Sequence, residues 1–151
     1  MIERIDRGVI RVVALVIVGL SLTACQRGSE AHDDESPAKI VHANGSQLSR
    51  VILSANAIER IGLKTDQVRE QRVSRSASPR KVVPYAALIY DLHGETWIYT
   101  NPEPRIFVRH RISVDYIDGD LAVLLEGPPP GTAVVTVGVA QLFGTELGVG
   151  N

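Results

Sequence analysis

Apolar and polar residues alternate most clearly in the segment "IFVRHRISVD", residues 106–115. Successive side chains of a β-strand point to opposite faces of a sheet, so alternation with period two is typical of a strand with one buried face. We expect a strand here, with His110 buried and hydrogen-bonded on the apolar face. The two expected faces are Ile106, Val108, His110, Ile112 and Val114 on one side and Phe107, Arg109, Arg111, Ser113 and Asp115 on the other.

Other short apolar segments lie on both sides of this strand, and turn-forming residues separate them. The segment "DLHG" (91–94) and the pair Asp118-Gly119 predict two hairpins, whereas the proline-rich "EGPPPGT" (126–132) predicts a stiff loop. Pro84 is expected to place the first part of its segment at a sheet edge or bulge, because proline lacks a backbone donor. The expected elements are strands "VVPYAALIY" (82–90), "ETWIYT" (95–100), "DLAVLL" (120–125) and "AVVTVG" (133–138), and a single helical turn in "VAQLFG" (139–144).

A short helix is expected near the start of the folded part. Ser54 is a typical N-cap residue, and Gly62 is the residue type that commonly ends a helix. A strand in "RVIL" (50–53) precedes this helix, and an extended segment, "LKTDQV" (63–68), follows it. The apolar face of the helix consists of Ala57, Ile58 and Ile61.

These elements define the expected fold class. About seven short strands and one short helix, with turns at regular spacing, predict a mainly β domain, a small antiparallel β-barrel or sandwich. The domain covers residues 50–151 of the 151-residue chain. Neither half has enough strands to enclose a core, so we expect the two halves to fold together.

The N-terminus has the layout of a signal peptide. Arg4, Arg7 and Arg11 flank an uncharged apolar run, residues 12–22, which ends in small residues. The run is shorter than the roughly 20 residues that a membrane-spanning helix needs. We therefore expect residues 1–24 to be a cleaved signal, with an uncleaved anchor helix as the alternative.

Cys25, the only cysteine of the chain, directly follows this region. The sequence Leu22-Thr23-Ala24-Cys25 resembles the lipobox of bacterial lipoproteins, in which the cysteine receives a diacylglycerol and becomes the first mature residue. The resemblance implies that Cys25 is the lipid attachment point. Its modified sulfur could not act as a catalytic nucleophile.

Residues 25–49 contain few apolar side chains and many Gly, Ser and acidic residues. Such a segment cannot bury enough surface to fold by itself, so we expect a lipidated flexible tether. Gln26 stands where an aspartate would retain an enterobacterial lipoprotein in the inner membrane. This sorting rule favours the outer membrane.

The second half of the chain resembles the closing segment of periplasmic adaptor subunits (membrane fusion proteins) of resistance-nodulation-division efflux pumps. The residues that match the family pattern are Pro84 and Ala87, then Gly94, Trp97, Ile98 and Tyr99, then Gly127, Gly131, Val134 and Val135. The segment "VILSANAIERIGLKTDQV" (51–68) also resembles the opening segment of these adaptors. In the family the two segments pair to form a membrane-proximal domain.

A full adaptor carries a β-barrel, a lipoyl-like domain and a helical hairpin between these two segments. Here only residues 69–81 occupy that place, and the core "SRSAS" of that segment is typical of a linker. The resemblance implies a truncated adaptor that docks on an inner-membrane efflux transporter or its full-length adaptor and supports export. It favours the inner membrane, against the signal from Gln26.

Residues 69–81 are strongly basic. They form either a solvated linker or a docking surface, and such a surface would bind anionic lipid headgroups or an acidic face of a transporter. The candidate docking residues are Arg69, Arg72, Arg75, Arg80 and Lys81.

Other chemistry is weakly indicated. His32 and His42, with the acidic residues 33–35, are metal-ligand types, and they leave a periplasmic metal-binding or metal-chaperone lipoprotein as the alternative function. We expect no metal site and no cofactor, because ordering a flexible segment around an ion costs free energy and nothing rigid orients the ligands. Trp97 and Tyr99, on one side of their strand, are expected to pack in the core.

Catalysis and nucleic-acid binding are not expected. The chain has no nucleophile elbow, no His-Glu-x-x-His motif and no phosphate loop. Its 16 Lys and Arg residues against 17 Asp and Glu residues produce no field that would attract nucleic acid.

Overall fold

The computed structural model describes residues 36–42 and 48–149, all of which belong to one compact unit, residues 35–151. The predicted signal peptide, Cys25 and His32 lie outside the described residues. The described part is mainly β with a curled antiparallel sheet, which confirms the expected fold class. Its strands are β1 (Ala38–His42), β2 (Ser49–Leu53), β3 (Lys64–Gln67), β4 (Arg69–Gln71), β5 (Arg80–Pro84), β6 (Ile89–Tyr90), β7 (Thr96–Glu103), β8 (Ile106–Asp118), β9 (Leu121–Glu126) and β10 (Ala133–Val137).

The described helices are α2 (Ala55–Ile61), the 3-10 turn η1 (Tyr85–Ala87) and α3 (Val139–Glu146). The expected caps of α2 are confirmed: the Ser54 hydroxyl accepts a hydrogen bond from the backbone N–H of Ala57 at 3.1 Å, and Gly62 ends the helix with a φ of 65°. The single turn expected after β10 is instead the eight-residue helix α3. Leu142 on α3 is fully buried, so tertiary packing extends the helix beyond what its sequence predicts.

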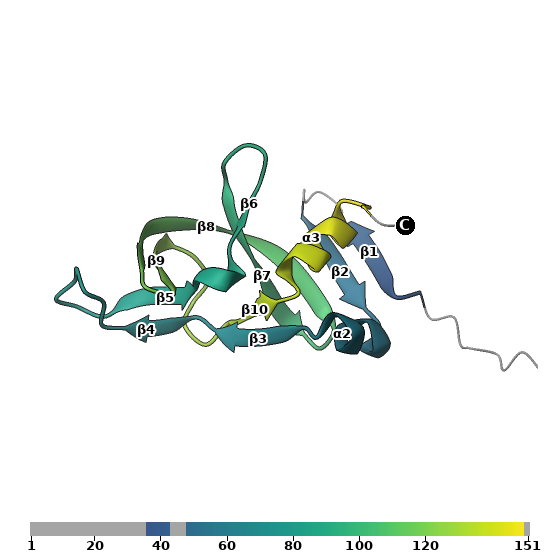
Figure 1. Cartoon of the computed structure of the whole chain (residues 1–151), viewed down its shortest axis with the longest axis horizontal. Coiled ribbons are helices and arrows are strands. Elements are labelled where there is room, and N and C mark those ends of the chain that lie inside the picture. Colours follow the sequence, from purple (N-terminus) through teal and green to yellow (C-terminus); the bar gives the residue numbers. More distant parts are fainter. Residues whose placement is uncertain (1–35, 43–47, 150–151) are drawn as a thin grey trace, which may run out of the picture. The chain divides into compact units, whose positions relative to one another are not determined.

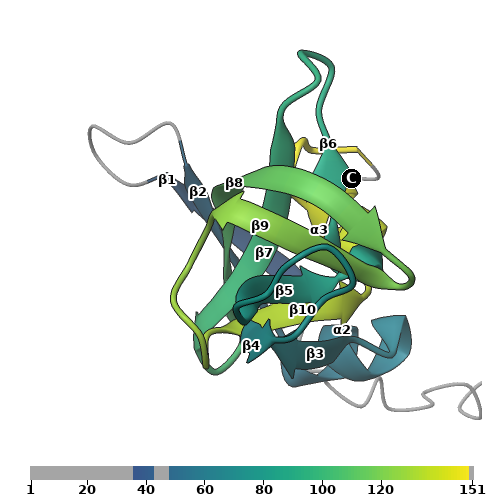
Figure 2. The same cartoon turned by 90° about the vertical axis from the view of Figure 1, so that its left-hand side faces the viewer.

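The sheet is strongly curled (Figures 1 and 2). The strand order is β3-β10-β7-β8-β9-β5-β4, and only Val68 separates β3 from β4 in the sequence. Val68 donates to the carbonyl of Thr132 at 2.9 Å and accepts from the N–H of Gly131 at 2.8 Å. The two halves of the domain therefore share one sheet, as expected, because β3 pairs with β10 and β2 pairs with β8.

Strand β8 contributes to the core on both of its faces. Phe107 belongs to a buried cluster with Tyr99, whereas Ile112 belongs to a second cluster with Ile98. His110 lies between these stretches and is exposed, so the prediction of a buried histidine is wrong. The alternation identifies the two faces of a strand, but it does not show which part of each face other elements cover.

Part of the predicted tether is folded. Strand β1 lies within residues 25–49 and pairs with β2, from Ala38 opposite Leu53 to His42 opposite Ser49. The tether prediction is therefore wrong for residues 38–42 and for Ser49. The amino-acid composition of a segment indicates only whether that segment could fold alone. Residues 38–42 instead pair with β2, which satisfies their backbone hydrogen-bonding groups.

The basic segment 69–81 forms a β-hairpin rather than a plain linker, because its two ends are β4 and the start of β5. Strand β5 lies between β4 and β9, so the expected edge position for this part of the chain is wrong. Its ladder with β4 nevertheless ends at Val82, two residues before Pro84. Proline therefore lies where the chain leaves the sheet for η1.

Candidate functional site

An open groove of about 600 Å³ lies between two walls of the domain. One wall comes from η1 and β6 and includes Leu88 and Tyr90; the other comes from the end of β10 and the first turns of α3 and includes Val137 and Phe143. Every residue that lines the groove is uncharged. Tyr90 and Val137 are 54% and 43% exposed.

The hairpin between β6 and β7 projects from the domain (Figures 1 and 2), and Ile89 and Tyr90 at its start line the groove. We call residues 90–95 the finger. Leu92 at its tip is fully exposed. The carboxylate of Asp91 closes the turn by accepting hydrogen bonds from the backbone N–H groups of His93 and Glu95, both at 2.9 Å, and from the Trp97 indole at 3.1 Å.

The Asp91 carboxylate is thus directed into the hairpin, away from the tip. Burial acts to raise the pKa of Asp91, but the hydrogen bonds from Glu95, Trp97 and His93 outweigh it, so the pKa is lowered. An ionised Asp91 holds the turn at neutral pH. The tip of the finger consequently presents Leu92 and His93.

A buried chain of polar contacts holds the α3 wall of the groove in place. The guanidinium of Arg109 lies between the Trp97 ring, at 4.9 Å, and the Phe143 ring, at 5.6 Å. Its Nε is 2.9 Å from the carboxylate of Glu146, whose side chain is 3% exposed. The Tyr99 hydroxyl donates to the same carboxylate at 2.5 Å. Helix α3, and with it Phe143 of the groove, is thereby held against β7 and β8.

The pKa of Tyr99 is raised above its ordinary value near 10, chiefly because the phenol is buried, and further because it donates to Glu146 and lies beside that negative charge. Above pH 10 an unfolded chain therefore loses a proton that the folded protein keeps. The stability contributed by neutral Tyr99 is complete below about pH 10 and falls at higher pH, by up to about 1.4 kcal/mol per pH unit.

Replacing Tyr99 by phenylalanine is expected to remove this alkaline loss. The slope of unfolding free energy against pH, measured by urea titration from about pH 9 to pH 11, becomes shallower by up to about 1.4 kcal/mol per unit. Tyr85→Phe, at a half-exposed tyrosine, is the control and keeps the wild-type slope. Equal slopes for the wild type and Tyr99→Phe would contradict the assignment.

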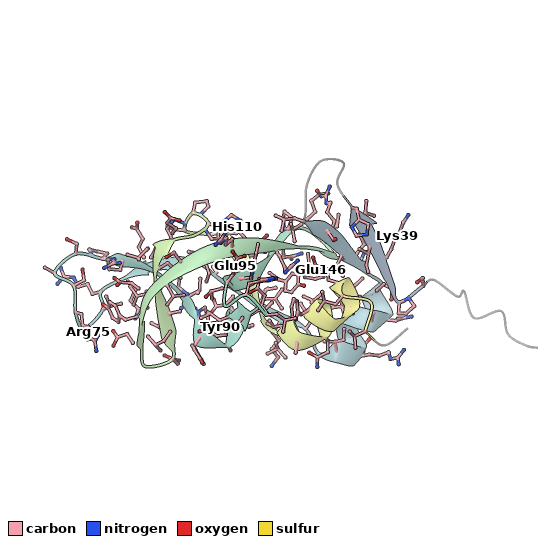
Figure 3. All side chains as sticks on the ribbon, turned by 90° about the horizontal axis from the view of Figure 1, so that it is seen from above. Lys39, Arg75, Tyr90, Glu95, His110 and Glu146 are labelled. Atoms are coloured by element: carbon pink, nitrogen blue, oxygen red, sulfur yellow. The ribbon has the colours of Figure 1, made fainter. Side chains whose placement is uncertain are left out.

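Four of the five predicted docking residues contact partners within the chain. Arg80 pairs with Asp115 at 2.9 Å, and the Lys81 ammonium donates to the carbonyl of Gly127 at 2.8 Å. These neighbours point to opposite faces of β5. Arg69 pairs with Asp66, Arg75 lies over the Tyr116 ring at 5.0 Å, and Arg72 is exposed. In Figure 3, Arg75 lies at the end of the domain away from Lys39.

The described residues form neither a metal-binding cluster nor a membrane-spanning helix. Within residues 36–42 and 48–149, no three His, Cys, Asp or Glu side chains come together as a metal ion would require. His42 bonds through Nδ1 to the Ser49 hydroxyl at 2.9 Å. Neither α-helix of the described part has the length and apolar character needed to cross a bilayer.

The sequence predicted the hairpin at residues 91–94, but it did not predict the groove or the exposure of Leu92. The leucine in "DLHG" was an available signal, because the tip of a hairpin offers an apolar side chain little to pack against. Phe143 carried no such signal, because its role depends on the position of α3.

Several residues that the sequence analysis singled out can now be placed. Trp97 and Tyr99 are in β7: the Tyr99 hydroxyl donates to Glu146, and the Trp97 ring lies against Arg109. Gly94 lies in the turn of the finger with a φ of 77°. Gly127 starts the loop after β9, where a side chain would lie 2.8 Å from Leu124. Comparison of the chain with protein-family models, with curated proteins and with solved structures found no match.

Proposed function

We propose that this protein is a lipid-anchored, adaptor-like docking protein on the periplasmic side of a cell membrane. Its partner is an inner-membrane efflux transporter or the full-length adaptor of that transporter, and it supports export across the membrane. The observation that carries the proposal is the uncharged groove beside the projecting finger. The resemblance of the sequence motifs to efflux adaptors supplies the class of partner.

The groove has the properties of a docking surface. Its exposed tyrosine is a residue type that is enriched in protein interfaces and often carries much of their binding energy. Arg109 and Glu146 hold one wall in place before any partner arrives. A preformed surface loses less conformational freedom on binding, which leaves more of the contact energy for affinity.

Attachment to the membrane complements a surface of this size. Several acyl chains on Cys25 would anchor the protein stably, whereas one chain gives marginal binding. Confinement to a membrane raises the effective concentration of the domain around its partner, so that weak docking is sufficient. The proposed membrane is the inner one, where the transporter resides.

The test is affinity purification of the tagged full-length lipoprotein from cross-linked, detergent-solubilised membranes, followed by mass spectrometry. An efflux transporter or full-length adaptor is expected among the enriched proteins. An unrelated tagged lipoprotein of the same membrane is the control for non-specific recovery. Recovery of efflux components no higher than with that control would overturn the proposal.

A further inference from the structure

The groove and the finger are complementary in chemistry. The groove is lined by uncharged residues, and Leu92 is the most exposed large apolar side chain among those described. No charged residue lines the groove, so the lining favours an uncharged occupant over a charged one. Leu92, at the tip of the finger, meets this requirement.

The carboxylates near the tip are already engaged within the chain. Asp91 accepts hydrogen bonds inside the turn, and Glu95 pairs with Arg111 at 2.6 Å. The finger therefore brings an apolar side chain without a free carboxylate. Because Leu92 is fully exposed, its side chain does not enter the groove of its own copy.

We propose that the groove receives the finger of a second copy of this chain, with Leu92 of each copy seated against Val137 of the other. Tyr90 is part of both the groove and the finger, so the two features are adjacent on one side of the domain. Adjacent complementary features allow a reciprocal contact about a two-fold axis, in which each copy gives and receives the same contact. This contact buries both the groove and the tip.

This inference goes beyond the proposed function and does not depend on it. A contact made by one finger and one groove per copy is small, so its dimer forms mainly where the membrane concentrates the copies. The groove cannot hold a finger and a docking partner together. Self-association consequently competes with docking on a transporter.

Disulfide trapping in membranes tests the contact directly. Two full-length forms with different tags are co-expressed, one carrying Leu92→Cys and the other Val137→Cys, and the membranes are oxidised with copper phenanthroline. Both positions are exposed, so the fold tolerates the changes. We expect a disulfide-linked pair carrying both tags, about tenfold above the wild-type pair, which has Cys25 alone.

Leu125→Cys, at a 60% exposed leucine on β9, replaces Leu92→Cys as the matched control and gives no linked pair above background. Three outcomes would overturn the proposal: a yield no higher than with Leu125→Cys, links between two Leu92→Cys copies alone, or links mainly to another protein. The last outcome would identify a different occupant. None of them affects the recovery of efflux components, so this inference and the proposed function fail separately.

Discussion

Replacing Glu146 by glutamine is expected to lower the free energy of unfolding by about 2–4 kcal/mol. The change preserves shape but removes the charge that balances Arg109, whose side chain is 16% exposed. The amide also accepts the Tyr99 hydrogen bond less strongly than a carboxylate does. Urea unfolding followed by tryptophan fluorescence measures the effect, because Trp97 lies against Arg109.

Glu103→Gln is the matched control for this change. Glu103 pairs with Arg50 at 2.7 Å, but the two side chains are 60% and 42% exposed, so the loss is expected to be below about 1 kcal/mol. An equal loss for both variants would show that the Arg109–Glu146 pair does not hold α3 in place. The assigned support of the groove wall would then be wrong.

Replacing Gly138 by alanine is expected to cost about 3 kcal/mol or more. Gly138 precedes α3 with a φ of 90°, a conformation that disfavours a side chain. A Cβ there would also lie 2.7 Å from Cγ2 of Ile61, the last residue of α2. The branched Ile61 side chain has little rotamer freedom, so the backbone of α3 has to shift.

Gly131→Ala separates the cost of the backbone conformation from the cost of the close contact with Ile61. Gly131 has a φ of 88°, but a Cβ there would meet nothing within 4 Å, so only the conformational cost of about 1–2 kcal/mol remains. Urea unfolding of both variants gives the difference, which measures the close approach of α2 and α3. Equal costs would contradict the packing described for the start of α3.

Local features of the fold were predictable because a few neighbouring residues determine them. Ser54 and Gly62 mark the ends of α2, and Asp118-Gly119 marks a turn, through chemistry that acts within one helical turn or one hairpin. The structure confirms each of these.

Features that depend on distant residues were not predictable. Glu146 ends α3, where the helix dipole disfavours a negative charge, and its partner Arg109 lies 37 residues earlier. The sequence alone therefore gives no reason to expect Glu146 there. The backbone hydrogen bonds of Val68 likewise depend on Gly131 and Thr132, far along the chain.

The partners of Arg80 and Lys81 in the basic segment, residues 69–81, could not be predicted either, because they lie far away in the sequence. Its cations look free in the sequence, but Arg80 and Lys81 find partners 35 and 46 residues away. The finger could be predicted as a hairpin from "DLHG". Its relation to the groove could not, since the second wall comes from residues near the end of the chain.

The most direct test of the account compares two tagged full-length variants in the membrane purification. Val137→Asp places a charge in the apolar groove, and Arg72→Glu reverses an exposed charge of the basic hairpin. Recovery of the efflux partner is expected to fall about tenfold or more with Val137→Asp and to change less than about twofold with Arg72→Glu. Full recovery with Val137→Asp and loss with Arg72→Glu would contradict docking through the groove and assign it to the basic segment.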